Sequence, residues 1–159
     1  MSGGSPDSRS TEGARALLFD RLVDDHPSVP VEQRPFRVLT LEGLRQSVQK
    51  EVSRLLNTRS PISAEEMEGK EGAWTILEWG LPDYTGWYTR SPPQQQRLAR
   101  LIESTLRAFE PRLKDPAVSV VREEEDNRSL TVRISGSVKL GSISEPVSFP
   151  LALQGPGVR

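Results

Sequence analysis

The sequence predicts an α+β domain in which two or three helices pack on one face of a small, mainly antiparallel, three-stranded sheet with an open edge. Residues 40–57 and 91–109 carry apolar residues at spacings of three and four, as amphipathic helices do. Residues 117–121, 130–140 and 147–153 instead alternate apolar and polar side chains, as half-buried strands do. Three strands leave at least one sheet edge unpaired, and natural proteins usually block or pair such edges.

Composition excludes several classes of function. The 159 residues suffice for one domain, and their mean hydropathy of -0.50 with no long apolar run argues against a membrane span. The absence of cysteine excludes disulfides, thiolate metal sites and a cysteine nucleophile, and the single histidine, His26, leaves no multi-histidine metal site. A net charge of -1 provides no basic field for nucleic acid. We therefore expect no catalytic, cofactor-binding or metal-binding residues.

The N-terminal region divides into a tail and a short helix. Residues 1–13 are polar and have almost nothing to bury, so we expect a disordered tail without a signal-peptide pattern and a cytoplasmic protein. Residues 14–24 predict an amphipathic helix that includes Leu18 and Leu22. Because about three helical turns are marginally stable alone, this helix must pack on its own domain or dock on a neighbouring subunit. A proline-broken linker containing His26, a loop histidine, completes residues 14–34, before the domain proper at 35–153 and a loose tail at 154–159.

The helix over residues 40–57 has recognisable ends. Thr40 is suited to the N-cap, and Asn57 is suited to a left-handed C-terminal cap ahead of Pro61. The apolar positions form a nearly continuous stripe, consisting of Leu41, Leu44, Val48, Val52, Leu55 and Leu56. This stripe predicts that the helix covers the core.

Residues 61–90 are the least regular part of the chain. Residues 63–72 read as an exposed acidic loop, and residues 74–77 fit either a short strand or a turn of helix. Trp74, Trp79 and Trp87 all lie in this region. We favour a role in anchoring the loops to the core, and the alternative is a contact surface, where tryptophan is enriched.

The segment from Ser91 to Arg112 joins the second long helix to the sheet. Ser91 is a suitable N-cap, Pro92 suits the first helical position, and Gln94 fits a capping box. Pro111 should end the helix at Phe109, because it lacks an N–H and disfavours helical geometry in the preceding residue. In an extended chain Glu110 and Arg112 would project side by side. We expect an exposed ion pair at this corner, contributing about 0–1 kcal/mol to stability.

The C-terminal third supplies the strands. Residues 130–140 are the clearest strand, and residues 123–127 form an acidic turn that we interpret as a solvated hairpin tip rather than a cation site. Pro150 cannot donate to a ladder, so the strand over 147–153 should lie at an edge or direct its proline outward. No P-loop, dinucleotide fingerprint, nucleophile elbow or HExxH motif occurs, and no carboxylate pair has a cleft-like setting. The residues alone favour a non-enzymatic interaction module over a hydrolase.

Several short stretches, in order and spacing, resemble the TssE family of type VI secretion baseplate subunits. They are LRQSV at 44–48, LLNTR at 55–59, GLPD at 80–83, FEPRL at 109–113 and LTVRISG at 130–136. The resemblance covers roughly residues 14–153. One departure is Trp79, where many relatives have tyrosine. The family is similar to the lysozyme-related wedge protein of contractile-tail phage baseplates.

The resemblance implies a structural protein of a cytoplasmic, membrane-docked baseplate. Its implied partners are the wedge subunits TssF, TssG and TssK and the sheath subunits TssB and TssC, with no cofactor, nucleic acid or direct membrane insertion. Glu110, Pro111 and Arg112 would contact the core bundle of the wedge, and sheath strands would add to the sheet. Leu18 and Leu22 are the expected contacts of the N-terminal helix. The alternative function is a lysozyme-like peptidoglycan hydrolase.

Overall fold

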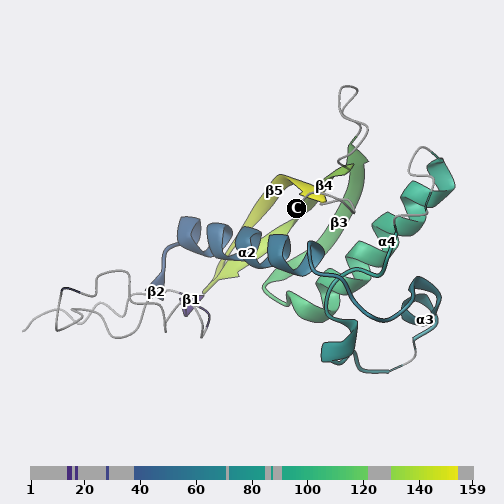
Figure 1. Cartoon of the computed structure of the whole chain (residues 1–159). Helices are drawn as coiled ribbons and strands as arrows, with labels where there is room; N and C mark the ends of the chain where they lie inside the picture. The colour runs from purple at the N-terminus through teal and green to yellow at the C-terminus, as the bar shows by residue number, and fades with distance from the viewer. Residues whose placement is uncertain are drawn as a thin grey trace, which may run out of the picture.

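The computed structural model describes residues 14–15, 17, 28, 38–70, 72–84, 87, 91–121 and 130–153. The predicted α+β fold is confirmed: three antiparallel strands lie in the order β3-β4-β5, and the long helices α2 and α4 pack on one face of the sheet (Figure 1). The elements of this layer pair are α2 (Leu41–Leu56), α4 (Pro92–Phe109), β3 (Leu113–Val121), β4 (Leu130–Leu140) and β5 (Ile143–Leu153).

One hydrophobic core lies between the helices and the sheet. Its fully buried side chains come from both long helices and from all three strands, and include Leu44, Val52, Leu56, Leu98, Ile102, Leu106, Leu113, Val132, Ile134 and Leu153. The two apolar stripes predicted from the sequence thus face the same core. Burial of a side chain of this size contributes about 1.5–3 kcal/mol before chain entropy is subtracted.

Helix α2 begins and ends where the sequence predicts, with one difference in its cap. The Gly43 N–H donates to Thr40 Oγ1 over 3.1 Å, which confirms the N-cap. Asn57 is the C-cap but has φ -96° and ψ 5°, so the expected left-handed conformation is wrong. The right-handed geometry lets the Asn57 N–H continue to Ser53 O (3.1 Å), and the next residues leave the helix without a left-handed turn.

Helix α4 confirms the predicted start at Pro92 and end at Phe109, whereas its predicted capping box does not form. Ser91 makes no side-chain cap hydrogen bond, and Gln94 Oε1 is buried without a partner. The two prolines that open the helix, Pro92 and Pro93, have no N–H, so the first turn has fewer donors that need a cap.

The region over residues 61–90 is more ordered than the sequence suggests. A five-residue helix, α3 (Ala64–Glu68), replaces the expected loop, and a 3₁₀ turn, η1 (Ile76–Glu78), settles the ambiguous segment as helical. Gly80 (φ 103°) lies so close to the end of α2 that an added Cβ would be 2.4 Å from Thr58 O. That close approach lets Leu81 bridge Arg59 and ties this region to α2.

The two strands that flank β4 are longer than predicted, since β3 and β5 each begin four residues earlier than expected. Strand β3 begins at Leu113 and contains an irregularity between Lys114 and Ala117, where Asp115 has φ 48°. Strand β5 begins at Ile143, directly after a two-residue turn in which Gly141 takes φ 58°, as the first position of a type II′ turn requires. Pro150 lies on β5, an edge strand, as predicted. The acidic tip at 123–127 lies outside the described residues.

The N-terminal region is described only in part. Strand β1 (Ala14–Arg15) pairs antiparallel with β2 (Val38–Leu39), so the predicted helix does not begin at residue 14. Residues 38–39 supply the partner strand that holds residues 14–15 in extended geometry. Leu18, Leu22 and His26 lie outside the described residues, as do the expected tails at 1–13 and 154–159.

Candidate protein interface

The chain between α4 and β3 forms a tight turn rather than the extended corner expected from Pro111. The Glu110 N–H donates to Leu106 O (2.9 Å) and closes the helix, and the Leu113 N–H donates to Glu110 O (3.1 Å) across the turn. Glu110 itself has φ -123° and ψ 71°, outside the helical region, which agrees with the restriction that the following proline imposes. The turn, and not an extended strand, brings Glu110 and Arg112 together.

Arg112 holds Glu110 in a bidentate ion pair. Arg112 Nε donates to Glu110 Oε1 (2.7 Å) and Nη2 donates to Oε2 (2.6 Å), while Nη1 donates to Ser47 Oγ of α2 (2.9 Å). The Arg112 N–H also donates to Glu110 Oε1 (3.3 Å). The pair therefore connects the end of α4, the start of β3 and the middle of α2.

The expectation of an exposed, weakly coupled pair is wrong. The Glu110 side chain is 5% exposed and that of Arg112 is 20% exposed. Removing one member of such a pair leaves a desolvated charge without its partner, which is costly. A single charge reversal should therefore destabilise the fold.

An apolar groove of about 370 Å³ lies beside the ion pair. Its walls are Leu17 from the N-terminal segment, Glu51 and Leu55 of α2, Trp79, Phe109, and the corner residues Glu110, Pro111 and Arg112. Pro111 is exposed, and Leu17, Trp79 and Phe109 are half-buried. The corner thus offers an exposed proline next to partly exposed aromatic rings, with the buried ion pair beneath.

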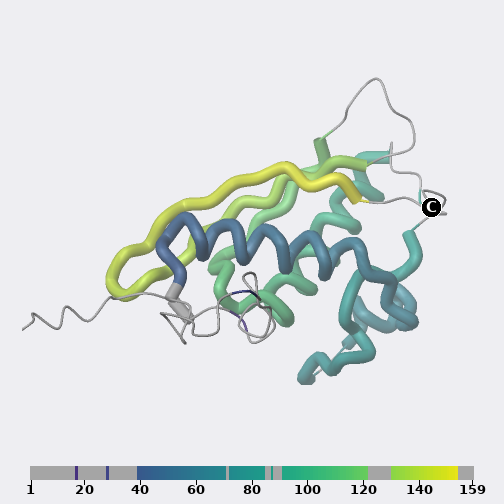
Figure 2. The backbone as a smooth tube through the Cα atoms, turned by 60° about the vertical axis from the view of Figure 1, so that its left-hand side comes forward, coloured from purple at the N-terminus to yellow at the C-terminus, as the bar shows by residue number. Residues whose placement is uncertain are grey.

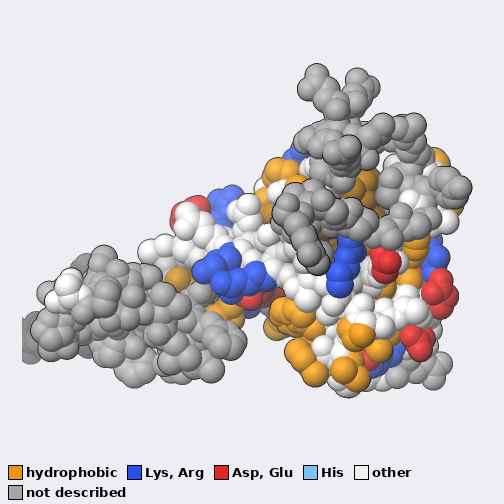
Figure 3. Space-filling model, in the orientation of Figure 1, with side chains coloured by type: hydrophobic (Ala, Val, Ile, Leu, Met, Phe, Trp, Pro, Cys, Tyr) orange, Lys and Arg blue, Asp and Glu red, His pale blue; other side chains and the backbone are white. Residues whose placement is uncertain are grey.

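The aromatic wall of the groove continues into η1. Trp74 and Trp79 both contact Phe109 edge to face, with ring centroids 5.9 and 5.2 Å apart. Between these tryptophans η1 exposes two apolar side chains, Ile76 at 77% and Leu77 at 57%. In Figure 3 hydrophobic side chains gather at the lower edge of the visible face. Trp74 and Trp79 therefore anchor this region to α4, as we favoured, while the turn between them exposes two apolar side chains.

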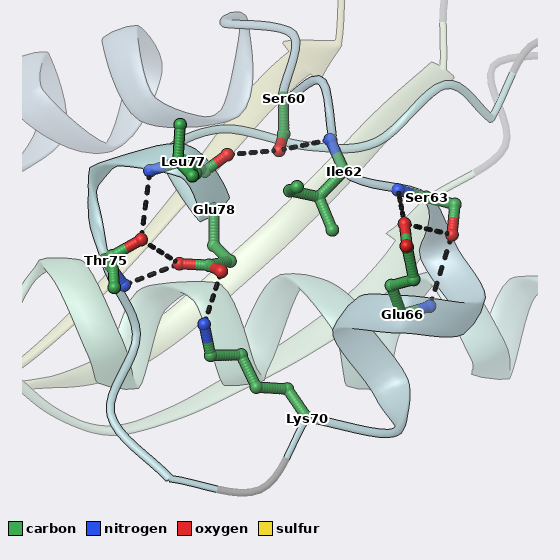
Figure 4. A network of polar contacts seen from close by, with 8 residues as sticks. All are labelled: Ser60, Ile62, Ser63, Glu66, Lys70, Thr75, Leu77 and Glu78. Atoms are coloured by element: carbon green, nitrogen blue, oxygen red, sulfur yellow. Dashed lines mark hydrogen bonds and ion pairs between the residues drawn. The ribbon is translucent and has the colours of Figure 1, made fainter.

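A buried carboxylate fixes the shape of η1 (Figure 4). Glu78 Oε2 accepts from the Thr75 N–H (2.5 Å) and the Thr75 hydroxyl (2.7 Å), and Glu78 Oε1 accepts from Lys70 Nζ. The hydrogen bond from Lys70, followed by those from Thr75, lowers the pKa of Glu78 from 4.5 to about 2. The carboxylate is therefore ionised at neutral pH and holds the turn that projects Ile76 and Leu77.

A second ion-pair cluster fastens α3 to α4. Arg97 Nε donates to Glu68 Oε1 (2.8 Å), and Arg97 Nη2 donates to Glu65 Oε1 (2.8 Å). The guanidinium lies 4.4 Å from the centre of the Trp87 ring. The hydrogen bonds to Glu68 and then to Glu65 raise the pKa of Arg97, and the hydrogen bond from Arg97 in turn lowers the pKa of Glu65. These acidic residues, which the sequence suggested as a loop, therefore serve a structural purpose.

Sequence reasoning missed Ser47, Glu78 and the pair Ile76 and Leu77. A signal for Glu78 was present, because Thr75-Ile-Leu-Glu78 has the spacing of a capping box. Ser47 carries no local signal, since its partner Arg112 is 65 residues away in the sequence. Among the described residues, no group of three or more potential ligands lies close enough to hold a metal ion, and no helix could span a membrane.

Comparisons with known proteins address the family and the fold. The model of the family described as baseplate wedge protein gp25 matches residues 42–142, which is more than half of the chain and includes all of α2 but its first residue, the corner and β4. The comparison with curated proteins finds no significant match. A chain in a solved structure described as the baseplate complex from the type VI secretion system is similar at 19% identity. That alignment covers 71% of this chain and 96% of that chain, with a TM-score of 0.49.

Proposed function

Because the chain belongs to the family of the baseplate wedge protein gp25, we propose that it is a TssE-type structural subunit of a type VI secretion baseplate. The observation that carries this proposal is the family match over residues 42–142, which contains the Glu110-Pro111-Arg112 corner. The TssE-like stretches of the sequence support the choice of a secretion system over a phage tail. The protein would work in the cytoplasm, in a baseplate docked at the membrane, and would have no catalytic role.

The corner surface is the proposed contact with the wedge subunits TssF, TssG and TssK. The ion pair is too buried to be the contact by itself, so Pro111, the exposed part of Arg112 and the aromatic groove would form it together. Ile76 and Leu77 extend this surface with apolar side chains on a rigid turn. Anchors of this kind, apolar and aromatic side chains around a desolvated charge, commonly dominate the energy of an interface.

Leu18 and Leu22 are proposed as a further contact with a neighbouring wedge subunit. Leu17, which directly precedes Leu18 in the chain, lines the groove beside the corner. The sheet provides the proposed connection to TssB and TssC, because an extended sheath segment can add to an edge strand through main-chain hydrogen bonds. Together these contacts would link the wedge to the first ring of the sheath.

An exchange of the two charges separates folding from binding. We compare Glu110→Arg, Arg112→Glu and the double exchange E110R/R112E in a thermal melt and in a pull-down with TssF, TssG and TssK. Each single reversal places two like charges together and should lower the melting temperature. The double exchange restores opposite charges within the turn and should recover much of that loss, yet it presents the wrong charge to the partner and should not bind.

The outcomes discriminate between a structural and an interface role. If the double exchange recovers both melting temperature and binding, the pair is purely structural and the corner is not the contact. Wild-type protein that fails to bind the wedge subunits under the same conditions would contradict the proposed function itself. A further variant, Ile76→Ser, tests the apolar turn without changing the ion pair. Its binding to TssF, TssG and TssK should also be reduced.

A further inference from the structure

A hydrogen bond that β3 donates to α4 shows which way the peptide groups of β3 point. The Val118 N–H donates to Glu103 Oε1 (3.0 Å) and therefore points away from β4. Because peptide groups alternate in direction along a strand, the groups of Val120 point outward as well, while those of Ala117, Ser119 and Val121 face β4. From Val118 onward, the outer edge of β3 is thus made of even-numbered residues.

The strand register then gives the direction of the peptide groups in β4 and β5. Val118 is opposite Ile134, whose peptide groups must then face β5, where Phe149 is its partner. The pair Leu140 and Ile143 closes the two-residue turn, the place where a hydrogen-bonded pair is expected. Odd-numbered residues of β5 therefore bond to β4. The outward-facing residues are Ser144, Pro146, Ser148, Pro150 and Ala152.

The outer edge of β3 is already occupied by α4. Glu103 accepts from Val118, Arg107 Nη2 donates to Pro116 O (3.4 Å), and the two side chains also pair with each other (3.5 Å). Irregular backbone next to Asp115 and a proline at 116 further disrupt this edge. Within the described part of β3 beyond Val118, Val120 alone keeps an outward N–H without a partner.

The outer edge of β5 has more free groups. Ser144, Ser148 and Ala152 direct N–H groups outward, and none of them has a hydrogen-bond partner within the described part of the chain. Pro146 and Pro150 occupy outward positions, where the missing N–H costs the ladder nothing. Asn57 Nδ2 approaches Ala152 O over a long distance of 3.5 Å. This edge therefore offers a donor at every fourth residue.

A narrow groove of about 80 Å³ lies along this edge, between α2 and β5. Its apolar lining includes Val138, Val147 and Phe149, and its α2 side includes Gln46 and Gln49. Figure 2 shows β5 running beside α2 at the outside of the sheet. Helix α4, in contrast, packs along β3 and closes the opposite edge with its side chains.

We infer that β5, and not β3, is the acceptor strand for an extended segment of a sheath subunit. This inference rests on the proposed sheath contact and specifies its location. Unpaired N–H and C=O groups in regular alternation are matched by another extended chain. The incoming segment alternates apolar and polar residues, with its apolar side chains beside Val147 and Phe149. Opposite Pro146 and Pro150 its carbonyls stay unpaired, so full pairs form at Ser144, Ser148 and Ala152.

Proline substitutions at outward positions test the two edges. Ser148→Pro removes an N–H from the β5 edge and breaks no ladder bond. Ser148→Ala loses the same hydroxyl, including its 3.1 Å contact with Ser135, but keeps the N–H. Val120→Pro removes the corresponding N–H from β3. Full-length variants are melted and then tested for co-purification with TssB–TssC sheath from cells that also contain the other baseplate subunits.

We expect sheath recovery with Ser148→Pro to fall by roughly tenfold relative to Ser148→Ala, which corresponds to the loss of one main-chain hydrogen bond. Val120→Pro, corrected for any fall in melting temperature, should recover sheath as wild type does. Equal recovery with Ser148→Pro and Ser148→Ala would overturn the assignment to β5, and loss confined to Val120→Pro would assign the contact to β3. If the wild-type chain recovers no sheath while it binds wedge subunits, the proposed sheath contact fails.

Discussion

The side chain of Arg112 connects the end of α4 and the start of β3 to α2, and part of it remains exposed at the surface. Its guanidinium pairs with Glu110 through two nitrogens and reaches Ser47 through the third. The planar, five-donor geometry of arginine makes this possible, and lysine could not reproduce it. The sequence predicted that Glu110 and Arg112 lie together, but it could not predict their burial, because Ser47 lies on a helix far away in the chain.

Removal of the Ser47 hydroxyl measures the connection to α2. Ser47→Ala should lower the free energy of unfolding by about 1–2 kcal/mol, since a hydrogen bond to a charged group is lost in a partly buried setting. Ser104→Ala is the matched control, because its hydroxyl donates only to Arg100 O within α4 and its loss should change stability by less than about 0.5 kcal/mol. Chemical denaturation of both variants provides the measurement. Equal stability of the two would mean that the Ser47 contact contributes nothing.

Two short polar stretches form helical turns because each begins with a reciprocal capping box. Ser63 and Glu66 form a capping box at α3, and Thr75 and Glu78 form one at η1. Helix periodicity cannot detect elements this short, since five residues or fewer do not complete a stripe, so the sequence left residues 63–77 as loop or undecided. The long helices were predicted to within one residue because their stripes extend over four turns or more.

The ionised state of Glu78 should make stability depend on pH in a defined range. Its pKa is lowered from 4.5 to about 2 in the folded protein, so its contribution is fully present above pH 4.5 and is lost as the pH falls through 2. Glu78→Gln cannot ionise and should lack this contribution. Melting temperatures of the variant and the wild type, measured between pH 6 and about 2, should differ most at the upper end and converge at the lower end. A constant difference would show that the carboxylate charge is not what holds η1.

At the scale of the whole molecule, α2 lies between the two proposed contact surfaces. Ser47 meets Arg112 at the corner, whereas Arg45 pairs with Glu145 of β5 over 3.2 Å. The sequence predicted the layers, the strand of 130–140 and the edge position of Pro150, because periodicity and proline chemistry are local. It could not predict that α4 covers one sheet edge and leaves the other open, since Glu103 meets Val118 only once the helix has packed.

The arrangement of these surfaces predicts that the two contacts are independent. The corner is built from the end of α4 and one flank of α2, and the acceptor edge is built from β5 and another flank of α2, with no described residue shared between them. Changes at sites that share no partners usually have additive effects.

The double exchange E110R/R112E should therefore lose wedge binding while the purified chain still associates with sheath. Ser148→Pro should lose sheath binding while it binds TssF, TssG and TssK normally. The combined variant should show both losses, and its change in melting temperature should equal the sum of the two separate changes. If either set of changes abolishes both contacts without unfolding the chain, the two surfaces are coupled through α2, and the wedge and the sheath would not bind independently.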